Sequence, residues 1–256
     1  MRGLQWFNAL STGATPVEGL ADSLKVADGV VGEQAVRFIA VVTDAQNRFP
    51  RARNGEVGLL EGWGLAKAVD EAIEKGDKRP IIAIVDVPSQ AYGRREEALG
   101  IHQALAAAAD SYARARLAGH PVIALLVGKA MSGAFLAHGY QANRMIALRD
   151  PGVMVHAMGK ASAARVTLRS VEELEALAAS VPPMAYDIDS YASLGLLWKT
   201  LEVSQIEQPT ADDVAQVSDC LLHAIQDIHS PDLKGRLGAS NRAASSHVRQ
   251  LLREQW

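Results

Sequence analysis

Runs of consecutive apolar residues alternate along the chain with segments whose apolar residues recur at helical spacing. The apolar runs at residues 35–43, 81–87 and 122–127 predict strands that are buried on both faces of a sheet. The spacing over residues 59–75 and 94–118 predicts one helix after each of the first two strands. Because strands and helices alternate in this order, we expect an α/β core with mostly parallel strand pairing.

The second half of the chain repeats this alternation more weakly. Residues 144–148 and 153–157 predict two short strands joined by a turn, and a helix is expected from about residue 161. Two strands followed by a helix form a strand-strand-helix unit. Further helices are expected at residues 172–180, at residues 214–228, and near the end of the chain through Val248, Leu251 and Leu252.

The chain of 256 residues is long enough for one sizeable hydrophobic core and has no segment that resembles a long linker. We expect a single main domain over residues 31–230. Residues 1–30 are expected to form an N-terminal arm that is stable only when it docks, with Trp6 and Phe7 as apolar anchors. Residues 231–256 are expected to form a C-terminal tail with a surface or interface helix.

Composition narrows the classes of function. The 26 basic and 29 acidic side chains give a formal net charge of -3, which favours neither nucleic acid nor an anionic membrane as the main partner. Cys220 is the only cysteine, which excludes an internal disulfide and a four-cysteine zinc ribbon and favours a reducing cytoplasm. No opening segment has the pattern of a signal peptide, and the apolar runs are far shorter than the ~20 residues of a membrane span. We therefore expect a soluble, cytoplasmic protein.

The sequence contains no motif for a metal or a dinucleotide. No G-x-G-x-x-G segment follows a predicted strand, so a dinucleotide cofactor is not supported. His138 has no partner at a metal-ligand spacing, and no cluster of His, Asp and Glu indicates a catalytic metal.

The chemistry is expected in the stretch from Pro121 to Gly139. The predicted strand at residues 122–127 is followed by Gly128, which we expect to open a turn. Three small residues, Ser132, Gly133 and Ala134, then begin an apolar run and predict a helix start. The first amides of a helix have no internal partner, and small side chains let a ligand oxygen approach them, so this arrangement indicates an oxyanion site. The alternative is that these residues are small only because the helix packs tightly on the sheet.

Four blocks of sequence, in this order, carry a family resemblance. Together they resemble the carboxyl-terminal half of the carboxyltransferase component of biotin-dependent carboxylases. That half has the crotonase-type fold, a spiral of strand-strand-helix units that Clp-type proteins share. Within this group the chain looks most like the gamma subunit of biotin-independent malonate decarboxylase, over roughly residues 30 to 230. The blocks are residues 40–49 (AVVTDAQNRF), 81–100 (IIAIVDVPSQAYGRREEALG), 121–135 (PVIALLVGKAMSGAF) and 153–166 (VMVHAMGKASAARV).

The resemblance implies a reaction and its partners. It implies that the chain acts with a beta subunit to decarboxylate the malonyl thioester of an acyl carrier protein to the acetyl thioester. No biotin is expected, and no cofactor bound covalently to this chain. In the family the main-chain N–H groups at the Gly133 and Ala134 positions belong to an oxyanion hole. Ser132 and His156 are further catalytic candidates, although Ser132, like Ser89, stands where the carboxylases usually have glycine.

Several residues are candidates for binding the substrate. Lys129 offers a point charge for the malonyl carboxylate, although a lysine beside a turn is more often solvated. Gln90 and Tyr92 follow a predicted strand, where the sites of α/β proteins gather, but plain turn packing accounts for them equally. Ser89 and Gly159 complete this set. A loop cluster suited either to the phosphates of a carrier-bound prosthetic group or to solvent consists of Arg48, Arg51 and Arg53.

Two other functions remain open at this point. The blocks around Ser132 and His156 also resemble those of Clp-type serine peptidases, with Asp187 or Asp189 as the residue that orients the histidine. In the second alternative the chain is a non-catalytic assembly subunit, because two glycine positions of the family are serines here.

Overall fold

The computed structural model describes residues 1–237 and 239–256 and has one mixed sheet at its centre. The strands are β1 (Thr15–Pro16), β2 (Leu24–Val31), β3 (Gln34–Val41), β4 (Ile81–Val87), β5 (Val122–Met131), β6 (Arg144–Leu148), β7 (Met154–His156) and β8 (Lys199–Leu201). They lie in the order β1-β2-β3-β4-β5-β6-β8, and β7 pairs with the end of β5 beyond β6. The pairs β1–β2 and β2–β3 are antiparallel and the remaining pairs are parallel, which confirms the predicted α/β core.

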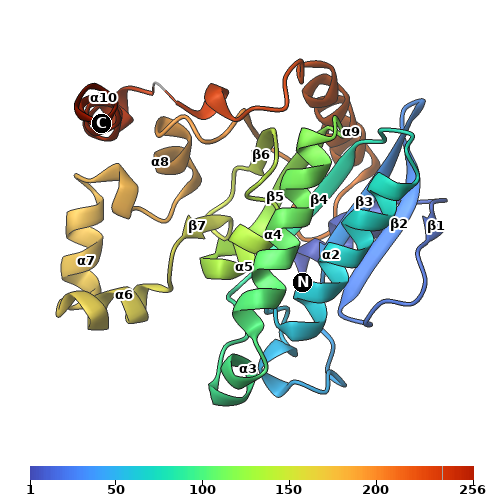
Figure 1. Cartoon of the computed structure of the whole chain (residues 1–256), viewed down its shortest axis with the longest axis horizontal. Coiled ribbons are helices and arrows are strands. Elements are labelled where there is room, and N and C mark those ends of the chain that lie inside the picture. Colours follow the sequence, from blue (N-terminus) through green and yellow to red (C-terminus); the bar gives the residue numbers. More distant parts are fainter. Residues whose placement is uncertain (238) are drawn as a thin grey trace.

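Helices cover both faces of the sheet. The α-helices are α1 (Arg2–Leu10), α2 (Leu59–Glu74), α3 (Arg94–Ala98), α4 (Ile101–Leu117), α5 (Ser132–Ala137), α6 (Lys160–Thr167), α7 (Val171–Ala178), α8 (Ile188–Ser193), α9 (Ala211–Gln226) and α10 (Ala243–Gln255). Short 3-10 helices are η1 (Pro50–Ala52), η2 (Pro182–Met184), η3 (Lys234–Arg236) and η4 (Ser240–Arg242). α2 and α4 pack side by side on the face turned towards the viewer in Figure 1, and α1 and α9 contact the sheet from behind. None of the helices in the described part of the chain is both long enough and apolar enough to cross a bilayer.

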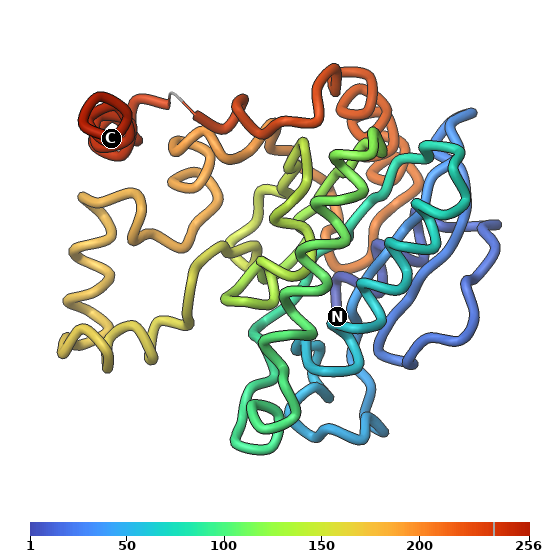
Figure 2. Tube along the Cα trace, in the orientation of Figure 1, coloured from blue at the N-terminus to red at the C-terminus, as the bar shows by residue number. Residues whose placement is uncertain are grey.

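The strand-strand-helix unit after β5 leads away from the sheet. Figure 2 shows the chain passing from β7 into α6, α7 and α8 and then returning to the sheet, where β8 pairs with β6. These helices form a lobe beside the sheet, and α10 ends the chain on the same side of the view. The site described below lies where this lobe meets the end of β5.

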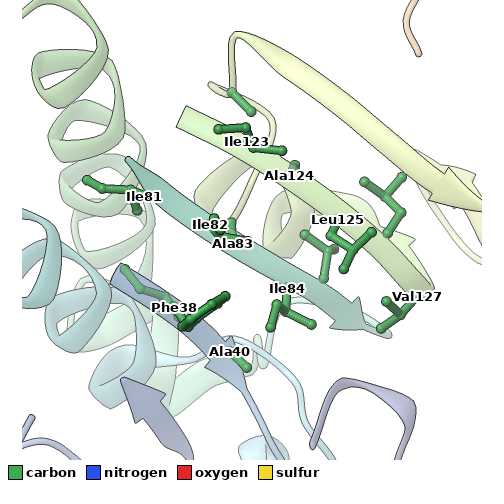
Figure 3. Close-up of a cluster of buried hydrophobic side chains, with 14 of the residues drawn as sticks. Phe38, Ala40, Ile81, Ile82, Ala83, Ile84, Ile123, Ala124, Leu125 and Val127 are labelled. Carbon is green, nitrogen blue, oxygen red and sulfur yellow. The ribbon is translucent and has the colours of Figure 1, made fainter. Parts of the chain in front are cut away.

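The core is centred on β3, β4 and β5. Their apolar side chains meet between neighbouring strands, as Figure 3 shows, and those of Phe38, Ile82, Ile84, Ile123 and Leu125 are fully buried. Side chains of successive residues point to opposite faces, so runs without polar residues are required where helices cover both faces. This is why consecutive apolar residues correctly predicted β4 and the first part of β5.

The N-terminal segment is more regular than the predicted arm. α1 buries Trp6 and Phe7 in the core, and the indole Nε1 of Trp6 donates to the carbonyl oxygen of Ile206 at 2.9 Å. β1 and β2 then join the sheet. β2 was not predicted, and it crosses the expected boundary at residue 30. Residues 1–30 therefore contribute a helix and strands to the fold, with the two predicted aromatic anchors inside it.

The prediction of a turn at Gly128 is wrong, because β5 continues through it to Met131. Beyond β6, residues 129–131 pair with β7, which keeps the backbone of β5 hydrogen-bonded. A side chain at Gly128 would collide with the carboxylate of Asp86, which accepts the N–H of Lys129 at 3.1 Å. Gly128 thus marks a close approach between β5 and β4.

The single helix predicted over residues 94–118 is two helices, α3 and α4. Gly100 between them has a φ of 82°. This left-handed conformation favours glycine and interrupts the helix, so the chain changes direction between the two segments.

His138 is a polar side chain buried between β4 and α4. Its Nε2 lies 3.0 Å from the carbonyl oxygen of Ile84, and its Nδ1 lies 3.0 Å from the hydroxyl of Tyr112. Because a carbonyl only accepts, Nε2 carries the proton and Nδ1 accepts from Tyr112. Burial lowers the pKa of His138 to about 4, so this imidazole is neutral in the folded protein.

The pKa of His138 predicts that stability falls as the pH falls. An unfolded chain binds a proton at this histidine below about pH 6.5, whereas the folded protein does not until about pH 4. The free energy of unfolding should therefore decrease between these values, by as much as ~3 kcal/mol. Urea unfolding at a series of pH values measures this slope.

Two variants separate this effect from other titrations. His138→Gln should be less stable at neutral pH but should lose most of the slope, whereas His247→Gln, at an exposed histidine, should keep it. Equal slopes for the protein and His138→Gln would contradict the assignment.

Candidate active site

The end of β5 positions the first group of site residues. Lys129, Ala130 and Met131 pair in parallel with the three residues of β7, so that Met131 lies opposite His156. Ser132 follows directly and begins α5, which confirms the predicted helix start. The carboxyl ends of β5 and β7 thus bring Ser132 and His156 to the same edge of the sheet.

Ser132 has a backbone conformation that favours glycine. Its φ is 58°, in the left-handed region that residues with a side chain seldom occupy. A residue with a Cβ incurs a cost of roughly 1–2 kcal/mol in this conformation. The family resemblance implies that the carboxylases usually have glycine at this position, and a left-handed backbone is a physical reason for such a preference.

The amide of Gly133 points at the side chain of Gln90. Its N–H donates to Gln90 Oε1 at 2.9 Å. Val57 forms a bridge with Gln90 by bonding to the residues on either side of it. Its N–H donates to the carbonyl of Ser89 at 3.1 Å, and its carbonyl accepts the N–H of Ala91 at 2.8 Å. An oxygen therefore already occupies the position in front of the Gly133 amide. Sequence reasoning did not predict this contact.

His156 is oriented by main chain and by an aromatic ring. Its Nδ1 lies 3.0 Å from the carbonyl oxygen and 3.2 Å from the amide nitrogen of Met158. The ring stacks on that of Tyr186, with centroids 3.9 Å apart, and the Tyr186 hydroxyl donates to the same Met158 carbonyl at 2.9 Å. Burial lowers the pKa of His156, so the imidazole is neutral at pH 7.

A cavity of about 590 Å³ extends from Ser132, Gly133 and His156 into the lobe. Leu136 and Tyr140 line it on the side of α5, and residues of α6, η2 and α8 close the other side. Its lining is mostly apolar, and among the described residues it includes no Asp, Glu, Lys or Arg. The cavity therefore suits an uncharged group.

The other predicted site residues differ in their burial and in the groups that they contact. Ala134 is buried in α5 behind Gly133. Ser89 precedes Gln90 and its hydroxyl donates to the Gln90 carbonyl at 3.0 Å, while Tyr92 on the same loop is exposed. Lys129 and Gly159 are also exposed, and none of the five predicted substrate-binding residues lines the cavity.

The geometry does not form a serine peptidase triad. Within residues 1–237 and 239–256 no hydrogen bond joins Ser132 to His156. Asp187 instead caps α8 by accepting the amide of Ser190 at 2.8 Å, and Asp189 pairs with Arg149 at 3.1 Å. The Nδ1 atom of His156 faces the main chain of residue 158. The described residues also contain no group of three or more His, Cys, Asp or Glu side chains arranged to hold a metal ion.

The fold defines the class of protein, because it is similar to that of the carboxyltransferase (crotonase-like) domains. A chain of transcarboxylase 12S matches the structure with a TM-score of 0.65 and 21% sequence identity, over 85% of this chain and 38% of that chain. A match at this identity shows the fold, and it confirms the predicted crotonase-type architecture.

The sequence then identifies the family. Residues 52–256 match the model of the malonate decarboxylase gamma subunit (MdcE), and the chain belongs to this family. A relative from Malonomonas rubra, the malonyl-S-ACP:biotin-protein carboxyltransferase MADD, is 36% identical over 230 residues, which are 86% of this chain and 75% of the relative. The predicted family is therefore confirmed.

Solved structures of the same family are closely similar. A chain of a Pseudomonas malonate decarboxylase hetero-tetramer in complex with coenzyme A is 71% identical, with a TM-score of 0.96 over 100% of this chain and 99% of that chain. A chain of the Pseudomonas MdcD-MdcE hetero-dimer is 67% identical, with a TM-score of 0.92 over the same shares.

The left-handed backbone at Ser132 predicts an unusual response to glycine. Ser132→Gly should preserve or raise the free energy of unfolding, whereas Ser132→Val should lower it by more than ~1 kcal/mol. Ser218, inside α9, is the matched control, because Ser218→Gly should lower stability by about 0.5 kcal/mol through helix propensity. Thermal unfolding of the variants checks this, and equal losses from glycine at both positions would contradict it.

Proposed function

We propose that this chain is the gamma subunit of a malonate decarboxylase and decarboxylates the malonyl thioester of an acyl carrier protein together with a beta subunit. The observation that carries the proposal is the Gly133 amide, which donates to an oxygen at the start of α5 and borders an uncharged cavity. In the working enzyme, an oxygen of the substrate replaces Gln90 Oε1 on this amide. The Ala134 N–H supplies a second donor.

The proposed decarboxylation needs hydrogen-bond donors and does not need a nucleophile. Decarboxylation breaks the bond to the carboxylate carbon and moves its electron pair towards the thioester carbonyl, which gives an enolate and carbon dioxide. A backbone donor aimed at the oxygen where this charge develops is worth ~2.7–4 kcal/mol. Acetyl thioester then forms when the enolate carbon takes up a proton. No covalent bond to Ser132 is needed for these steps.

The uncharged surroundings favour the loss of the carboxylate. A carboxylate is poorly stabilised where no cation faces it, whereas carbon dioxide is neutral. The neutral His156 fits this environment, because it adds a hydrogen-bonding group to the wall without adding charge. In this proposal Ser132 and His156 contact the substrate, and the main-chain amides stabilise the developing charge.

The similar proteins support the proposed substrate and partners. The 67% identical chain of the MdcD-MdcE hetero-dimer motivates a beta-type partner, and another 67% identical chain, from a hetero-tetramer in complex with malonate, motivates the substrate class. The Malonomonas rubra relative is named for two reactants, malonyl-S-ACP and a biotin-protein. The first of these motivates a carrier-bound thioester. For this chain we propose the carrier thioester without biotin, with no cofactor bound covalently to the chain and a cytoplasmic location.

Substitution of Gly133 tests the oxyanion site. A Cβ at this position would lie 3.4 Å from Gln90 Oε1, an ordinary contact, so Gly133→Ala should fold and assemble. It should nevertheless lower turnover, because the methyl group lies beside the oxygen position. Gly133→Val should lower turnover by more than the ~10²–10³ that loss of one donor costs. Decarboxylation of malonyl thioester by the assembled complex measures both.

Side-chain variants provide the comparison. Ser132→Ala should stay within roughly tenfold of the unmodified complex, since the main-chain donors survive, and His156→Asn should lose less activity than Gly133→Val. Circular dichroism and co-elution with the partner exclude a failure to fold or assemble. An assembled Gly133→Val complex with near-normal turnover would place the oxyanion site in the partner and favour an assembly role for this chain.

The isolated chain should be inactive. α10 buries none of its residues. It exposes apolar side chains that include Val248 and Leu252, and Trp256, which follows it, is exposed as well. We expect the partner subunit to cover apolar surface of this kind and to complete the site. Assays of the chain alone and after addition of the partner measure this dependence. Turnover of malonyl thioester by the chain alone would contradict the prediction.

A further inference from the structure

An exposed group of arginines lies at the end of the molecule that α3 occupies. Arg48, Arg51 and Arg53 belong to the loop around η1, and Arg94 and Arg95 begin α3. The two segments lie side by side at the lower end of Figure 1, where the loop before α2 meets α3. We call these five residues the arginine patch. Every one of them is exposed, although the whole chain has a formal net charge of -3.

The arginines of the patch form no close ion pairs with their own neighbours. In the parts of the chain described here, none of its guanidinium groups lies within 4.0 Å of a carboxylate oxygen, whereas Arg114 and Arg144 each form an ion pair of 2.7 Å or less. The acidic residues of the same segments are Asp44, Glu56, Glu96 and Glu97. Asp44 and Glu56 accept backbone amides. Glu96 is buried, and its Oε2 and the Nε of Arg51 each lie 2.6 Å from the place that a Cβ on Gly93 would take, so this carboxylate is a neighbour of Arg51. Glu97 is exposed. The patch therefore presents positive charge to a partner.

The patch is held in shape by packing. The guanidinium groups of Arg48 and Arg95 lie 4.9 and 5.2 Å from the centre of the Phe49 ring, which is buried between the two segments. Phe49 packs with Ala91 and Ile101 in a small apolar cluster that joins the loop to the segment before α3 and to α4. Fixed side chains lose less conformational entropy when they bind, so these two arginines are preorganised for contact.

The same segments lead to the proposed active site. The loop that carries the arginines reaches Val57, which bridges to Gln90, and Gln90 contacts the Gly133 amide. Tyr92 lies between Gln90 and Arg94 along the chain and is 55% exposed. The loop that carries the arginines is thus joined through the Val57–Gln90 bridge to the residue that contacts the Gly133 amide.

We infer that the arginine patch is the docking surface for the acidic face of the acyl carrier protein that delivers the thioester. This inference rests on the proposed function, because it takes the carrier-bound thioester as substrate. Positive charge beside the site attracts an acidic carrier and orients it so that its flexible arm reaches Gly133. Long-range attraction of this kind speeds encounter and weakens as salt is added.

The test measures binding of the carrier by the assembled two-subunit complex. Arg51 and Arg94 are the residues to change, because neither makes a hydrogen bond or stacks on Phe49 in the described structure. Arg51→Glu combined with Arg94→Glu should raise the Kd for a fluorescently labelled carrier by ~10-fold or more, and added salt should reduce the difference. The Kd for coenzyme A alone should stay unchanged, because that probe has the phosphates without the carrier.

Control variants separate charge from folding. Arg51→Lys combined with Arg94→Lys keeps the charge and should bind the carrier nearly as the unmodified complex does. Lys234→Glu reverses one charge, where the double variant reverses two, at an exposed position elsewhere and should leave the Kd unchanged. Because binding is measured without turnover, a complex that binds the carrier but does not decarboxylate it would contradict the proposed function alone.

Three results would overturn the inference. An unchanged Kd for the carrier would show that the patch does not contact it. Equal increases for the carrier and for coenzyme A would show that the patch binds phosphate groups instead. Loss of co-elution with the partner subunit in the glutamate variant, but not in Lys234→Glu, would show that the patch is a contact between subunits.

Discussion

The hydrogen bonding of β5 on both of its edges is the constraint on which the site depends. β4 pairs with it on one side, and β6 followed by β7 pairs with it on the other. The strand can therefore continue past Gly128, and its pairing with β7 ends it at a fixed place beside His156. The position of the turn into α5 is therefore fixed as well, because α5 begins directly after β5. A loop in the same place would not hold the Gly133 amide against a ligand with comparable accuracy.

The structure keeps its donor occupied until a substrate arrives. Gln90 Oε1 satisfies the Gly133 N–H, so the amide is not left without a partner in the free chain. The proposed substrate oxygen exchanges with this side-chain oxygen, and the exchange costs less than exposing an unpaired donor. The uncharged cavity adds the second element, since it provides space without a cation that would hold the carboxylate in place. Donor and cavity together account for the proposed decarboxylation without a nucleophile.

Sequence patterns predicted the parts of the fold in which one local rule dominates. β4 was predicted with its full range, because buried parallel strands require consecutive apolar residues. β2 was missed, because Lys25, Asp28 and Gly29 interrupt its apolar residues. Its formation depends on pairing with β3, which the pattern within the segment does not show. Gly128 was misassigned because a glycine needed for a close approach has the same appearance in sequence as a glycine in a turn.

Sequence patterns predicted only those features of the site that are formed by residues close together in the chain. The residues from Ser132 to Ala134 are adjacent in the chain, so their helix start was visible, and the family resemblance added His156. The Gln90 contact joins residues 43 positions apart, and the stacking of Tyr186 on His156 depends on the path of the lobe. The left-handed backbone of Ser132 had one signal in the sequence, the glycine that the resemblance to the carboxylases led us to expect at this position. Its cause became clear only from the φ angle.

The most direct test of the central claim is a crystal structure of the assembled complex with a stable analogue of the malonyl thioester. We expect an oxygen of the analogue to lie ~2.7–3.1 Å from the Gly133 nitrogen and Gln90 Oε1 to have left that position. A structure in which Gln90 still accepts the Gly133 N–H, while the oxygens of the analogue are held by donors of the partner subunit, would contradict it.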